Sequence, residues 1–315
     1  LDVKNASTGD GNITIASAQG DLNITKIVAS GANNTVTLAA AGKIADATIP
    51  GTENDAVISA ANLSATAGNG IGEANNLIEI KVDNLEAQTT NGGVYFNDLS
   101  GNLQIGGVTP NLGKPALNGI EATAGDIVIK TAGAMLVSET VTAGNNVSLT
   151  ATDGNITTNA AIKATQGNVT MDAGTNIALN GAVTANKDVS LTATAGDIKT
   201  INAAVTATTG KITMNAGTDI TLDGAVTAKQ DVLLKANGGN ITTTAKATTT
   251  GDNVTMDASK AIALNGAVTA NRDVSLTATA GDIKTTNAAV TATTGKITMN
   301  AGTDIALDGA VTAKQ

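Results

Sequence analysis

The chain has 315 residues, of which 42% are hydrophobic, 14% charged and only 1% aromatic, and its formal net charge is −9. The absence of Cys and His removes disulfides, thiol nucleophiles, imidazole bases and the usual zinc ligands. The acidic balance disfavours nucleic acid as a partner, because phosphate binding needs clustered Lys and Arg. No apolar run is long enough to span a bilayer.

Residues 1–142 show short alternating strands separated by irregular stretches. In an extended strand, apolar side chains at alternate positions share one face. Such triplets begin at Ile13, Leu22 and Val36. All the glutamates and prolines of the chain lie before residue 143, and we expect loops that project from the fold at 45–55 and 106–119. Around the two aromatic residues, the alternation predicts that Phe96 points inward and Tyr95 outward.

Residues 143–315 repeat the same pattern with a regular spacing. The first apolar triplets of successive turns begin at Val147, Val169, Val189, Ile212, Val232, Val254, Val274 and Ile297, so that the steps run from 20 to 23 residues. Two further triplets follow in each turn, and Gly, Asn and Asp separate them as corner residues. Three short strands and three corners in about 20–23 residues predict one coil of an all-β, three-sided parallel β-helix, a β-solenoid.

The sequence also contains a repeat that is longer than one coil. Segments 188–230 and 273–315 are identical except at two positions, Ile201 against Thr286 and Thr221 against Ala306. The second core position alternates between Leu and Met from one coil to the next. The unit is therefore a two-coil module of 42 or 43 residues, doubled to an 85-residue repeat. We predict one continuous solenoid, with divergent coils and loop insertions at 1–142 and regular tandem repeats at 143–315.

Chemistry-bearing residues do not converge on a site in this pattern. The corner aspartates repeat in pairs, Asp197 with Asp282 and Asp219 with Asp304, and we expect them to bond local backbone. We therefore assign no catalytic, cofactor-binding or metal-ligating residue, leave the binding residues unknown, and predict a protein that is not an enzyme. Calcium at Asp and Asn corners stays open, although the glycine-rich nonapeptide of calcium-binding β-rolls is missing.

The outward side chains bear on two further roles, ice binding and glycosylation. Ice binding needs a flat ladder of Thr-x-Thr pairs, and Leu233 and Lys235 interrupt that ladder. The sequons at Asn155, Asn168 and Asn253 follow from an Asn corner that enters an Ile/Val-Ser/Thr strand, so chance explains them better than glycosylation.

Several phrases resemble one family. Residues 179–198 (LNGAVTANKDVSLTATAGDI) and 167–181 (GNVTMDAGTNIALNG) are similar to the haemagglutinin repeats of filamentous haemagglutinin-like exoproteins, the large secreted partners of two-partner secretion systems in Gram-negative bacteria. Residues 63–108 are similar to a segment of its giant members. The resemblance implies a right-handed β-helix that passes an outer-membrane secretion pore, with roles in adhesion, aggregation and biofilm formation.

Together these features predict a non-enzymatic fibrous adhesin stalk, at the bacterial outer cell surface or secreted. Its expected partners are a host or neighbouring cell surface, through a glycan or protein receptor. The alternative is a self-assembling subunit of an extracellular filament or sheath. Both ends look cut within a repeat pattern, so we expect a fragment whose unpaired strand edges favour self-association.

Overall fold

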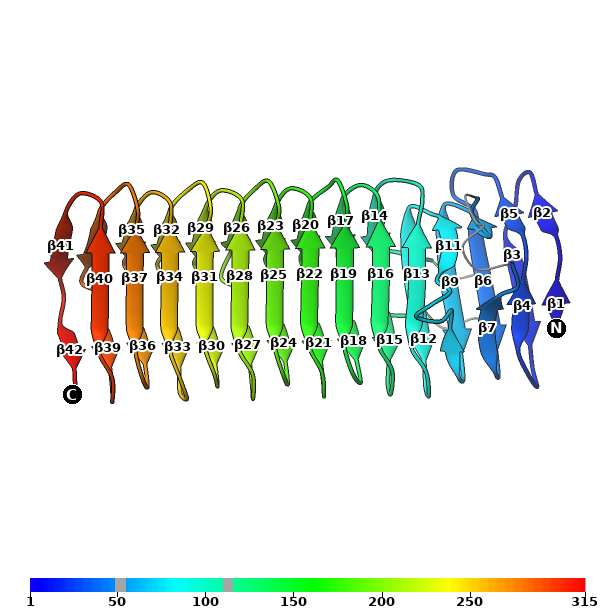
Figure 1. Ribbon diagram of the computed structural model, residues 1–315. Helices are drawn as coiled ribbons and strands as arrows, with labels where there is room; N and C mark the ends of the chain where they lie inside the picture. Colours follow the sequence, from blue (N-terminus) through cyan, green and yellow to red (C-terminus); the bar gives the residue numbers. More distant parts are fainter. Residues whose placement is uncertain (49–54, 110–115, 315) are drawn as a thin grey trace. The chain divides into compact units, whose positions relative to one another are not determined.

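The computed structural model describes residues 1–48, 55–109 and 116–314, and all the regular elements in these ranges are β-strands. The chain divides into two compact units, Leu1–Thr165 and Gln166–Gln315. Within each unit, strands of successive coils lie side by side and run parallel, three to a coil (Figure 1). The predicted parallel β-helix is therefore confirmed. The division at 142/143 and the continuity of one solenoid stay predictions.

The first unit has two kinds of coil. In its earlier coils the third strand is the longest, and the strands are β1 (Asp2–Val3), β2 (Ala6–Thr8), β3 (Ile13–Ser17), β4 (Leu22–Ile24), β5 (Ile27–Ala29), β6 (Thr35–Ala40), β7 (Lys43–Asp46), β8 (Ile58–Ser59), β9 (Asn62–Ala67), β10 (Gly70–Ile71), β11 (Ile78–Lys81) and β12 (Asn84–Thr89). In its later coils the first strand is the longest, and the strands are β13 (Val94–Asp98), β14 (Leu103–Ile105), β15 (Ile120–Ala122), β16 (Ile127–Thr131), β17 (Met135–Val137), β18 (Val141–Ala143), β19 (Val147–Ala151), β20 (Ile156–Thr158) and β21 (Ile162–Ala164).

The change between the two kinds of coil is made by splitting and merging strands. The short strands β10 and β11 both pair with the long strand β13, through Ile71 with Val94 and Ile78 with Phe96. The long strand β12 pairs with both β14 and β15 of the next coil. One side of the β-helix, its wall, thus consists of the single strand β12 in one coil and of the two strands β14 and β15 in the next. The residues between β14 and β15 are not needed for strand pairing in this wall.

In every coil of the second unit, the first of the three strands is the longest. Its strands are β22 (Val169–Ala173), β23 (Ile177–Leu179), β24 (Val183–Ala185), β25 (Val189–Ala193), β26 (Ile198–Thr200), β27 (Val205–Ala207), β28 (Ile212–Ala216), β29 (Ile220–Leu222), β30 (Val226–Ala228), β31 (Val232–Ala236), β32 (Ile241–Thr243), β33 (Ala247–Thr249), β34 (Val254–Ala258), β35 (Ile262–Leu264), β36 (Val268–Ala270), β37 (Val274–Ala278), β38 (Ile283–Thr286), β39 (Val290–Ala292), β40 (Ile297–Ala301), β41 (Ile305–Asp308) and β42 (Val311–Ala313). Successive coils pair in register, strand above equivalent strand.

The predicted alternation of Leu and Met in the core is confirmed. Leu191 pairs with Met214, and Met214 pairs with Leu234, all of them fully buried. A second buried column alternates Leu with Thr, as in Leu222 against Thr200 and Thr243. Layers of unlike shape interlock, which keeps a narrow aliphatic interior close-packed without aromatic side chains.

Corner residues join the coils through their side chains. Asp188 Oδ1 accepts the backbone N–H of Lys211 in the next coil at 2.9 Å, and 85 residues later Asp273 Oδ1 accepts that of Lys296 at the same distance. Two asparagines 85 residues apart, Asn202 and Asn287, adopt left-handed backbone with φ of 56° and 52°. These findings confirm the corner assignment, because short polar side chains tolerate that conformation and bond nearby backbone.

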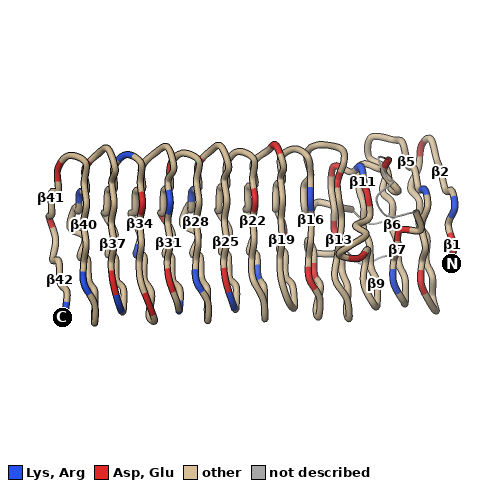
Figure 2. The backbone as a smooth tube through the Cα atoms, viewed as in Figure 1, with Lys and Arg blue, Asp and Glu red and all other residues tan. Residues whose placement is uncertain are grey.

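Along the backbone of both units, acidic and basic residues are interspersed with neutral ones (Figure 2). The residues that the structure describes contain no helix long and apolar enough to cross a membrane.

Candidate functional site

The irregular wall of the first unit centres on the split of β12. Leu85 of β12 pairs with Ile105 of β14, whereas Ala87 pairs with Ile120 of β15. Glu86 stands between these two positions, where the next coil supplies no strand partner. The residues between Ile105 of β14 and Ile120 of β15 form an insertion, and its described residues Val108 and Leu117 contact Glu86.

The described ends of this insertion, residues 106–109 and 116–119, are called here the covering segments. The outward side chains of Thr37, Ser64 and Glu86 form one row across β6, β9 and β12, and all three are buried, with Glu86 only 1% exposed. Val108 is buried too, and the Thr109 carbonyl accepts a hydrogen bond from Thr35 Oγ1 at 3.3 Å.

The described ends of the predicted loop at 106–119 contact the wall through Val108 and Gly119, which are buried, and the projection of the loop stays a prediction. At the other predicted loop, 45–55, residues Lys43–Asp46 form β7, so the loop begins later than expected. Residues 49–54 and 110–115 of the two predicted loops lie outside the described residues.

Two carboxyl groups hold the covering segments. Glu86 Oε1 accepts the Val108 N–H at 2.9 Å, and the Leu117 N–H also bonds the Glu86 carboxyl group. Glu139, in the turn between β17 and β18, accepts the Gly107 N–H through Oε1 at 3.1 Å. The neutral backbone of the covering segments is thus anchored by acceptors on two different coils.

Glu86 and Glu139 also contact each other. Their side chains lie within hydrogen-bonding reach, yet the Oε2 atom of each is sealed from solvent and has no donor among the described residues. Two ionised carboxylates offer no donor to one another, so the contact becomes a hydrogen bond only when one of them is protonated. Burial raises the pKa of Glu86 to about 7, with a further contribution from the negative charge of Glu139.

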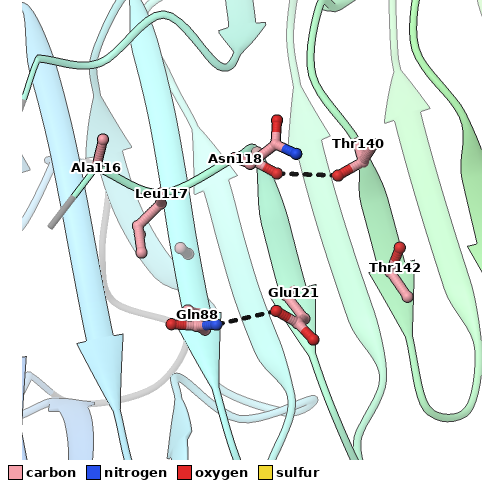
Figure 3. A pocket seen from close by; sticks show the side chains of 9 residues that line it. Gln88, Ala116, Leu117, Asn118, Glu121, Thr140 and Thr142 are labelled. Atoms are coloured by element: carbon pink, nitrogen blue, oxygen red, sulfur yellow. Dashed lines mark hydrogen bonds between the residues drawn. The ribbon is translucent and has the colours of Figure 1, made fainter.

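Beside this pair lies a polar groove of about 410 Å³. Its floor carries Gln88 of β12, Glu121 of β15 and Thr142 of β18, which are register partners in one outward row. Gln88 Nε2 donates to Glu121 Oε2 at 2.9 Å, and Thr140 Oγ1 donates to the Asn118 carbonyl at 2.9 Å (Figure 3).

The groove offers both hydrogen-bond donors and acceptors. Covering residues 116–118 form one of its walls, so the groove and the acid pair share a structural element. A carboxylate, an amide and hydroxyl groups together can bind a ligand rich in hydroxyl or cationic groups.

The aromatic and corner residues singled out from the sequence lie as follows. Phe96 is fully buried and Tyr95 is half-buried on the outer face, as predicted. Asp197 accepts hydrogen bonds from the Thr218 hydroxyl and the Asp219 amide, and these bonds hold its pKa below the ordinary value. Asp197, Asp219 and Asp282 thus bond backbone, as predicted, but the backbone belongs to the next coil instead of their own turn.

The structure also shows how residues lie that bear on the expectations for calcium, glycosylation and ice binding. No group of three or more acidic side chains in the described ranges is arranged to hold a metal ion, and calcium stays a prediction. The side chain of Asn253 donates to Asp231 Oδ1 and accepts the Asp273 N–H, both at 3.0 Å. This sequon asparagine therefore has a structural role. Leu233 is 40% exposed and interrupts the ladder of outward hydroxyl side chains along the first strands.

Sequence reasoning missed Glu86, Glu139 and the row of Gln88, Glu121 and Thr142. The alternation of residues 84–89 puts Glu86 and Gln88 at equivalent outward positions, yet one is buried and the other exposed. The only signal in the sequence is the confinement of glutamate to the irregular first part.

The chain matches no protein-family model, no curated protein and no solved structure. The class that its fold defines is the parallel β-helix built from repeats, and the resemblance to filamentous haemagglutinin-like exoproteins stays a prediction.

Proposed function

We propose that this chain is a non-enzymatic stalk of a fibrous adhesin, related to the filamentous haemagglutinin-like exoproteins, displayed at or released from a bacterial cell surface. The observation that carries the proposal is the structural equivalence of the repeats. Thr209 Oγ1 donates to the Asn186 carbonyl at 2.7 Å, and 85 residues later Thr294 Oγ1 donates to that of Asn271 at the same distance. Such repeats extend the solenoid by stacking one coil on the next without adding a new kind of site.

We propose that the receptor contact lies in the first unit. A groove of about 360 Å³ also lies beside Leu233 in the second unit, but outward side chains of repeated coils line it. The groove over Gln88, Glu121 and Thr142 has a wall from a non-repeated insertion, and loops and insertions on a rigid scaffold are common positions for binding. The receptor that suits its chemistry carries hydroxyl or cationic groups, as a surface glycan or a protein does.

Adhesion by the purified chain tests the proposal. Labelled protein is incubated with a panel of cells and with immobilised glycans, and its assembly state is followed by sedimentation velocity. We expect monodisperse protein that binds, and a Gln88→Ala/Thr142→Ala variant that binds at least tenfold more weakly. A Thr213→Ala variant, altered in the groove of the second unit, is the matched control and binds as the wild type does.

Two results would redirect the function. Reversible polymerisation through one repeated contact, without cell binding, would support a filament or sheath subunit. Turnover of a polysaccharide that a single Asp→Asn substitution abolishes would contradict the non-enzymatic role.

A further inference from the structure

The buried acid pair lies where the first unit changes its coil type. Glu86 occupies the one outward position of β12 whose neighbour in the next coil is an insertion, and Glu139 reaches it from the turn after β17. Glu86 is nearly inaccessible to solvent, and no basic side chain in the described part of the chain pairs with either carboxyl group. A buried carboxylate without a cation is costly unless it is neutralised.

The donors around the pair are backbone amides. Gly107, Val108 and Leu117 direct their N–H groups at the two carboxyl groups, which satisfies one side of each. The remaining Oε2 atoms, sealed from solvent, have no donor among the described residues. A proton that lies between two carboxyl groups in hydrogen-bonding contact is a partner that both sealed oxygen atoms can share.

No other titratable group faces Glu86 among the described residues of the packed elements. The covering segments contribute Gly, Val, Thr, Ala, Leu and Asn, and β9 contributes Ser64. Glu121, on the adjacent strand, is exposed and bonds Gln88. The titration of Glu86 thus depends on its burial and on its contact with Glu139.

We propose that Glu86 and Glu139 share one proton, and that this shared proton is a latch that keeps the covering segments on the wall and is lost in alkaline solution. When the second carboxyl group ionises, two like charges in contact repel each other in a site that excludes water. Glu139 accepts the Gly107 N–H, whereas Glu86 accepts the Val108 and Leu117 N–H groups. When the two carboxyl groups move apart, these hydrogen bonds can no longer all form, and the covering segments come off the wall.

The latch has a consequence for the neighbouring groove. Residues 116–118 form one wall of the groove. While the shared proton is present, the groove keeps its shape, and release of the covering segments at high pH opens it. This consequence rests on the proposed function of the groove, whereas the latch itself does not, and the two are therefore tested separately.

The proton is detected directly by NMR. The full chain has six glutamates, so selective ¹³Cδ labelling of glutamate gives a spectrum simple enough to assign by single substitution. We expect one resonance that titrates near pH 7 and is missing in Glu86→Gln, and whose titration changes in Glu139→Gln. A Glu121→Gln variant, altered at an exposed glutamate, leaves that titration unchanged. Titration of every glutamate below pH 5.5 would overturn the shared proton.

Hydrogen exchange detects the release. After correction for the intrinsic pH dependence, protection of the Val108 amide in the wild type is expected to fall about tenfold for each pH unit between 4.5 and 7, the ordinary and the folded pKa of Glu86, and to stay level above pH 7. Glu86→Gln replaces the proton with an amide N–H that donates to Glu139 at every pH, so its protection stays flat. Glu139→Gln is the second variant should Glu86→Gln fail to fold. Flat protection in the wild type, or the same fall in both variants, would contradict the latch.

Discussion

Replacement of Phe96 by alanine tests the narrow aliphatic interior of the first unit. Phe96 is the only phenylalanine of the chain, is fully buried, and lies in register between Ile78 and Ile129. Removing a buried ring leaves a cavity that aliphatic neighbours on fixed coils fill poorly, and such substitutions cost about 3–5 kcal/mol. Replacement by leucine retains much of the volume and should cost about 1–2 kcal/mol.

The measurement is urea unfolding of the full chain, followed by circular dichroism of the strand signal. Tyr95→Ala is the matched control, because it removes the adjacent aromatic ring from the outer face of the same strand, where the side chain is half-exposed. We expect that control to lower the free energy of unfolding by about 1 kcal/mol. Equal losses for Phe96→Ala and Tyr95→Ala, or a loss below about 1 kcal/mol for Phe96→Ala, would refute the inward assignment and its energetic role.

Three further predictions follow from single contacts. The pKa of Glu86 is about 7 in the folded chain against an ordinary 4.5, so its stabilising contribution, complete below pH 4.5, is lost as the pH rises through 7. Relative to Glu86→Gln, the wild-type free energy of unfolding should fall by about 3 kcal/mol between pH 4.5 and pH 9 in urea titrations, and a constant difference would contradict this. Asp188→Ala removes the acceptor for an amide of the next coil and should cost about 1 kcal/mol in the same assay, whereas Asp188→Asn keeps the acceptor and should cost little. Gly224→Ala brings a methyl group against the Ala203 carbonyl oxygen and should lower the thermal midpoint, whereas Gly9→Ala meets open space and should leave it within about 1 °C.

The regular coils could be predicted from the sequence in detail. Val189, Leu191 and Ala193 alternate with polar neighbours, and all three are fully buried as that alternation requires. Spacing by 20 to 23 residues determines which strands stack, because a coil of nearly constant length puts each strand above its own copy. Sequence alone thus determined the strand positions, the inward residues and the corners of the second unit.

The acid pair and the groove were decided by tertiary structure. Glu86 and Gln88 look alike in the pattern, and their burial differs only because β12 is followed by two strands and an insertion that returns over Glu86. Glu139 reaches Glu86 from 53 positions further along the chain. Strand pairing in this wall depends on how coils of unequal length stack on one another. No local periodicity of the sequence encodes that stacking. The chemistry of the site therefore arises from contacts that exist only in the folded chain.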